Sequence, residues 1–114
     1  MSKKIENNRR DDDRADQSLN TVLLRGRVSA PGVEKILPSE DRVVEFRLII
    51  SRPIQVGVDT LDIAAWNSKV RRRALTLKEG EWVEIAGSVR RRFWQGATGV
   101  ASRWQIEASE ITRI

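Results

Sequence analysis

Three side chains on one short stretch, Arg90, Arg92 and Trp94, have the types and spacing to bind a nucleic acid. Positions two apart point to the same face of a β-strand, so the two guanidiniums and the indole would form one row. Guanidiniums pair with phosphates, and an aromatic ring stacks on an unpaired base. The row favours binding of single-stranded nucleic acid; a solvated charged edge with a packed Trp is the alternative.

The strand that would carry this row is amphipathic. Its other face is apolar at most positions and can line a core; it carries Val83, Ile85, Gly87, Val89, Arg91 and Phe93. The residues after it, 95–99, contain two glycines and predict a flexible hairpin tip. A further strand is expected from about Val100 to Ile111, with Trp104 packed on the side of Ile106.

Three more strands are expected earlier in the chain, over residues 20–28, 44–51 and 60–66, because apolar residues alternate there. Gly26 predicts a bulge or sharp bend, and Pro31-Gly32 predicts a turn. A helix of about ten residues would begin at Asn67 or Ser68 and stop at Gly80.

Five strands with one helix between the third and fourth is the order of the OB-fold, an all-β Greek-key barrel. Residues 20–114 would form this domain. Its binding surface would include the second and third strands, with loops at about 30–41 and 93–101 as clamps. Residues 1–19 are charged, with few large apolar side chains, and predict a disordered tail.

Composition favours a polyanionic partner. The 114 residues carry a formal charge of +5, and equal numbers of acidic and basic side chains cancel within residues 1–19. The excess therefore lies on the expected domain. Arginine greatly outnumbers lysine, which favours planar and bidentate contacts over point charges.

Several function classes are excluded or disfavoured. The chain has no Cys and no His, which excludes disulfides, thiol catalysis and Cys/His zinc sites and removes the commonest general base. Asp62 and Glu84 lack a nucleophile or metal ligand as partner, so an enzyme is not expected, nor a metal or cofactor. No apolar run has membrane-spanning length, and a cytoplasmic protein is expected.

The stretch from Asn20 to about Ile114 resembles the bacterial single-stranded DNA-binding proteins of replication and recombination. The similar segments are residues 20–28, 46–51, 63–66 and 78–94. The last segment is the most specific, because the family has a glycine before that strand, a glycine within it and an Arg-x-Arg-x-Trp ending.

The resemblance implies largely sequence-independent binding of single-stranded DNA, in replication, recombination or repair. It implies stacking rings at Trp66 and Trp94, phosphate contacts at Arg90 and Arg92, and a weaker contact at Thr21. Two other aromatic positions of the family are Ile54 and Thr60 here, which implies weaker binding per site or more reliance on arginine.

For three other arginines the alternation alone indicates a direction. Arg25, Arg27 and Arg47 fall on the outward side of the first two strands, where they either line the groove or stay solvated. The run 71–73 is expected to be a solvated helix face.

The resemblance also concerns partners. The family is typically homotetrameric, so a homotetramer or a dimer is expected, with Trp82 and Glu84 at a subunit contact. Replicative members end in a long tail with an acidic tip that recruits proteins. This sequence ends with the expected barrel, so no tail-dependent recruitment is expected.

Two other functions remain open at this point. An OB module that binds RNA would use the same stacking and phosphate contacts. An OB-fold protein that binds polypeptides or joins a primosome-type assembly would account for the two missing aromatic residues.

Overall fold

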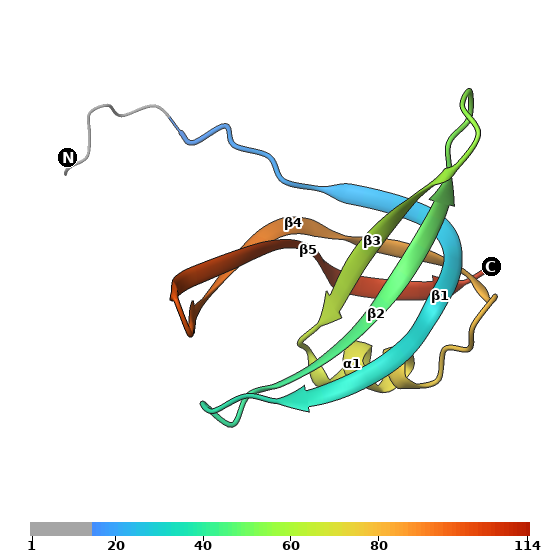
Figure 1. Cartoon of the computed structure of the whole chain (residues 1–114). Coiled ribbons are helices and arrows are strands. Elements are labelled where there is room, and N and C mark those ends of the chain that lie inside the picture. The colour runs from blue at the N-terminus through green and yellow to red at the C-terminus, as the bar shows by residue number, and fades with distance from the viewer. Residues whose placement is uncertain (1–14) are drawn as a thin grey trace.

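The computed structural model describes residues 15–114, which form a closed barrel of five strands with one helix (Figure 1). The elements are β1 (Val22–Ile36), β2 (Arg42–Ser51), β3 (Val58–Ala65), α1 (Ser68–Leu75), β4 (Trp82–Gly96) and β5 (Gly99–Arg113). This order confirms the expected OB-fold. Residues 15–21 have no helix or strand, and the rest of the expected tail, including Asp11–Asp13, lies outside the described residues.

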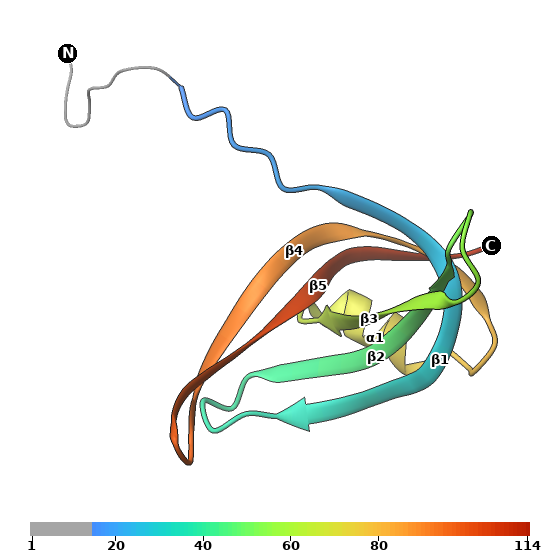
Figure 2. The same cartoon turned by 45° about the horizontal axis from the view of Figure 1, so that its top comes forward.

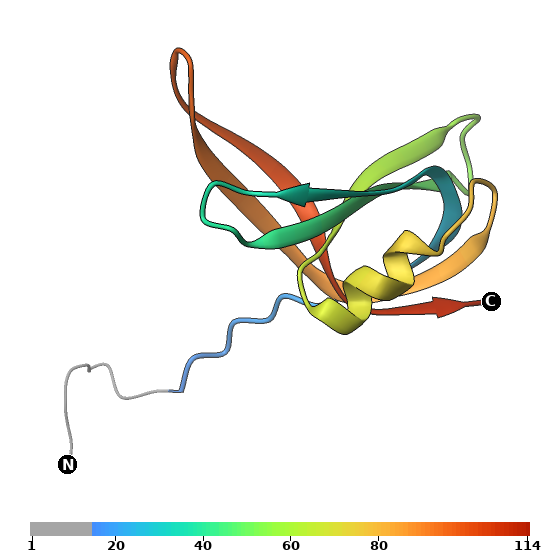
Figure 3. The same ribbon diagram turned by 90° about the horizontal axis from the view of Figure 1, so that it is seen from below.

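The strands close in the order β1-β2-β3-β5-β4, and β4 also pairs with β1. Every pairing is antiparallel except the short parallel contact of β3 with β5, at Ile63 opposite Ile106. β4 and β5 form a long hairpin that extends past the closed part of the barrel (Figures 2 and 3).

Apolar side chains from all five strands fill the barrel, and α1 covers one end of it. Leu48, Ile63 and Ile85 are fully buried. The helix begins as predicted at Asn67, whose side chain accepts hydrogen bonds from the next turn. Its apolar face, with Val70 and Ala74, packs into the core. No helix among residues 15–114 is long and apolar enough to cross a membrane.

The turn predicted at Pro31-Gly32 is wrong. β1 runs through both residues, and its register with β2 shifts between Val28 and Val33. Proline is tolerated at such an irregularity because no ladder hydrogen bond is required of it. Position 32 requires glycine because β1 passes close to α1 there: a Cβ would lie 2.8 Å from the carbonyl oxygen of Ala74.

Two other glycines differ from the prediction in part or in full. Of the bulge or sharp bend predicted at Gly26, the bulge is wrong, because Gly26 pairs with Val83 in regular register. The backbone of Gly26 passes directly against the carbonyl oxygen of Ile49, where a Cβ would not fit. The helix ends before Gly80, with Thr76 as its C-cap. Gly80 has φ of +88° and instead forms the turn that leads into β4.

Candidate nucleic-acid interface

The β4–β5 hairpin presents Arg90, Arg92 and Trp94 on one face, as the alternation predicted. They lie opposite Gln105, Arg103 and Ala101 of β5. This face, which we call the hairpin front, approaches the outer surface of β2 and β3, because Gln105 donates a 2.7 Å hydrogen bond to Glu45 of β2. All three surfaces expected of the fold meet here, because the loop between β1 and β2 lines the same space through Leu37, Pro38 and Ser39.

A groove runs between these surfaces through three adjoining recesses of about 440, 620 and 300 Å³. The first is lined by Trp66, Arg90 and Arg92. The middle one is lined by Lys35, Glu45, Arg92, Trp94, Arg103 and Gln105. The last includes Arg47 and Asp62. The groove thus brings together five of the predicted site residues, Arg47, Trp66, Arg90, Arg92 and Trp94.

Trp66, directly after β3, and Arg92 of β4 already contact each other. The guanidinium carbon of Arg92 lies 4.3 Å from the centroid of the indole, which is a cation–π contact. Arg71 donates to the carbonyl of Trp66 and so helps to hold the end of β3. Arg71 is therefore not part of a purely solvated helix face. In this state Arg92 covers one face of the Trp66 ring.

Trp94 is the more accessible ring, with 48% of its surface exposed. It belongs to the middle recess together with Arg92, on the wall opposite Lys35 and Glu45. Arg90 lies 3.6 Å from Glu107 in an exposed ion pair. The hairpin front therefore combines an open ring with two guanidiniums, of which Arg92 rests on the Trp66 ring and Arg90 is weakly paired.

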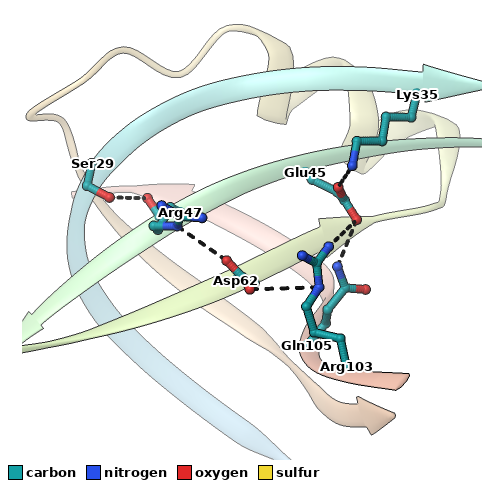
Figure 4. A network of polar contacts seen from close by, with 7 residues as sticks. All are labelled: Ser29, Lys35, Glu45, Arg47, Asp62, Arg103 and Gln105. Carbon is teal, nitrogen blue, oxygen red and sulfur yellow. Dashed lines mark hydrogen bonds and ion pairs between the residues drawn. The ribbon is translucent and has the colours of Figure 1, made fainter. Parts of the chain in front are cut away.

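The floor of the groove is a polar network (Figure 4). Arg47 lies 3.3 Å from Asp62, and Arg103 lies between Asp62 and Glu45, at 4.0 and 3.6 Å. Lys35 lies 2.7 Å from Glu45. In this network three cations, Lys35, Arg47 and Arg103, pair with two carboxylates. An anionic ligand would compete with these carboxylates for the cations.

Glu45 is the most strongly held of these carboxylates. Burial by itself raises the pKa of its carboxyl, but hydrogen bonds from Lys35 and Gln105 and the charges of Lys35 and Arg103 outweigh that effect. The pKa of Glu45 therefore lies below its ordinary value of 4.5, and the side chain is ionised at neutral pH.

Arg25 and Arg27 lie on a different surface from the groove. On β1 they are opposite Glu84 and Trp82, near the start of β4. Arg25 forms a 2.7 Å ion pair with Glu84, and Arg27 lies 5.8 Å from the centroid of the Trp82 ring. Arg90, Arg92 and Trp94 lie at the other end of β4. Arg25 and Arg27 do point outward from the barrel, as predicted, but not into the groove.

Thr21 is exposed just before β1. The side chain of its neighbour Asn20 exchanges two hydrogen bonds with the backbone of Val89, of 2.7 and 2.8 Å. Thr21 is therefore close to the part of β4 that leads into Arg90.

Sequence reasoning missed Lys35, Glu45 and Arg103 as groove residues. The alternation of β5 was a usable signal for Arg103, because it shares a face with Gln105. The expectation that Trp104 is packed is wrong, since 60% of its surface is exposed. Trp104 has the parity of core residue Ile106, but it lies on the part of the hairpin that extends beyond the barrel.

Comparisons with known proteins agree with this architecture. The model of the Single-strand binding protein family matches residues 19–114. Among solved structures, the chain is similar to "Plasmodium falciparum SSB complex with ssDNA". The TM-score is 0.66 and the identity 22%, over 89% of this chain and 99% of that chain, a likeness in fold. No curated protein sequence matches the chain significantly.

Proposed function

This chain belongs to the single-strand binding protein family, and we propose that residues 20–114 bind single-stranded DNA along the groove. One observation carries the proposal: Trp94, Arg92 and Trp66 follow one another along adjoining recesses, with Arg92 only 4.3 Å from the Trp66 ring. Alternating rings and guanidiniums match the alternating bases and phosphates of a single strand.

Binding would exchange one set of contacts for another. A base stacks on the open face of Trp94, and a second base takes the face of Trp66 that Arg92 covers. Arg92 then turns to a phosphate, with Arg90 and Arg47 on neighbouring phosphates. Every base has a flat face, so this arrangement is largely independent of sequence. Duplex DNA keeps its bases stacked inside and offers only its phosphates.

We infer that the protein is a binding protein and not an enzyme. It would act on exposed strands during replication, recombination or repair, on DNA in the cytoplasm. RNA offers the same rings and phosphates, and an RNA oligomer in competition tests that alternative.

The proposal is tested by titration with a thymidine oligomer and with duplex DNA, at two salt concentrations. Intrinsic Trp fluorescence should be quenched by the single strand and much less by the duplex. Affinity should fall as salt rises, because each neutralised phosphate releases counterions. Fluorescence that stays unchanged with the oligomer at low salt would instead support an OB-fold protein that binds polypeptides.

The variant Asp62→Asn in the same titration tests whether the groove is the site. Asp62 pairs with Arg47 at 3.3 Å and with Arg103 at 4.0 Å. Its neutralisation therefore frees Arg47 for phosphates, whereas Arg103 keeps its pair with Glu45. We expect the affinity to rise by roughly twofold to fivefold, in line with one exposed ion pair, and the salt dependence to steepen. Asp59→Asn is the control, because Asp59 lies at the start of β3 and pairs with Arg52 of the β2–β3 loop. A lower affinity of Asp62→Asn would contradict the competition between this carboxylate and DNA.

We propose that the protein also self-associates, as a dimer or tetramer, through the β1–β4 face. There 52% of Trp82 and 64% of Leu23 are exposed side by side with the Arg25–Glu84 pair. Trp82→Glu should shift the sedimentation coefficient toward that of a monomer, whereas Arg72→Glu on the helix should not. An unchanged coefficient for Trp82→Glu would rule out this face.

A further inference from the structure

The hairpin has a second exposed aromatic surface, on the side away from the groove. Arg91 and Phe93 of β4 and Ser102 and Trp104 of β5 share this side, which we call the hairpin back. Of these four residues, Arg91 also borders the first recess of the groove. Phe93 and Trp104 are each 60% exposed. They would point into the core if the barrel continued, but the hairpin extends past it (Figures 1 and 3).

The hairpin back is an ordered arrangement. The guanidinium carbon of Arg91 lies 5.2 Å from the centroid of the Phe93 ring and 5.4 Å from that of Trp104. Its nitrogens donate to the hydroxyl of Ser102, at 3.0 and 3.2 Å. The guanidinium is thus fixed next to two rings whose other faces are open.

The charge of this surface is unbalanced. Among the described residues Arg91 forms no ion pair, and the hairpin back has no carboxylate along residues 89–95 and 100–106. The groove differs, because Glu45, Asp62 and Glu107 lie among its cations. An apolar protein partner would bury this guanidinium unpaired, which is costly. A ligand with negative charges and flat rings would meet both the cation and the rings.

We propose that the hairpin back is a second contact for the same single strand, which passes from the groove over the hairpin. This inference rests on the proposed function of the groove. A base stacks on Trp104 or Phe93, and Arg91 binds a phosphate. Front and back belong to the same two strands, so they are only one sheet thickness apart and a few nucleotides connect them.

A variant with Trp104 as its only Trp reports this contact directly. The chain has four Trp residues, and Phe can replace Trp66, Trp82 and Trp94 while the rings needed for stacking remain. A thymidine oligomer of about 16 nucleotides should quench Trp104, whereas one of about six, which fills only the groove, should leave it unchanged.

A charge variant gives an independent readout. Arg91→Glu should lower the affinity for the longer oligomer roughly tenfold, as expected for one lost stacked and paired nucleotide. Because Arg91 also borders the first recess, the affinity of this variant for the short oligomer should fall too, but only about threefold or less, as for one exposed charge. Arg72→Glu on α1 is the matched control and should change neither affinity beyond the general effect of charge.

The outcomes separate this inference from the function of the groove. If the labelled long oligomer binds but Trp104 is not quenched, the hairpin back is not a contact and the groove still is. If neither oligomer binds, both proposals fail. If the fluorescence of Trp104 changes with protein concentration in the absence of DNA, a second copy of the chain covers this surface and the inference is wrong.

Discussion

Replacing both Trp66 and Trp94 by alanine should lower the affinity for a thymidine oligomer by about 100-fold or more. Each stacked base contributes about 1–3 kcal/mol, and the two rings serve separate bases in adjoining recesses. Arg92 would in addition lose the ring on which it now rests. Anisotropy of a labelled oligomer measures the loss, because Trp fluorescence is itself changed by the substitutions.

The matched control keeps the rings and changes only their size. Trp66→Phe with Trp94→Phe should bind within a few-fold of the unsubstituted chain, since phenylalanine also stacks on bases. A thermal melt of both variants separates binding from stability, because Trp66 is partly buried. If the alanine variant is folded and binds as before, the strand does not use the groove.

The row on β4 could be predicted because it depends only on the local geometry of a strand. Arg90, Arg92 and Trp94 share a face in any extended conformation, and the order of the elements indicated which loop they approach. The contact of Arg92 with Trp66 could not be predicted in this way. It joins β4 to the end of β3, and its existence depends on how the barrel closes.

Alternation distinguishes only inward from outward, and a closed barrel has an outward side all the way round. Arg25 and Arg47 are both outward, yet Arg47 lies in the groove and Arg25 pairs with Glu84 on the β1–β4 face. Trp104 shows that an inward direction does not guarantee burial either. Its side chain has the parity of the core residue Ile106 of β5, but it lies on the part of the hairpin that extends beyond the barrel and is exposed.

Gly87→Ala should unfold the protein at a markedly lower temperature, by about 10–20 °C. A Cβ on Gly87 would overlap the carbonyl oxygen of Glu107 and lie 3.2 Å from the Cα of Ala108. Both belong to the backbone of β5, which cannot swing aside as a flexible side chain can. We expect a loss of about 3 kcal/mol in the free energy of unfolding, which corresponds to that shift for a domain of this size.

The effect should extend to binding, because Gly87 lies where the hairpin leaves the barrel. The register of β4 with β5 shifts between Ala86 and Gly87, with Ser109 as the extra residue of β5. This bulge bends the hairpin and so aims Arg92 and Trp94 at the groove. Ser88→Ala, the next residue of the same strand, is the control and should leave the melting temperature nearly unchanged. The free energy of unfolding is measured by urea titration. If it is the same for Gly87→Ala as for the unsubstituted chain, β5 can move away from β4 at low cost, and the close approach of the two strands does not depend on glycine.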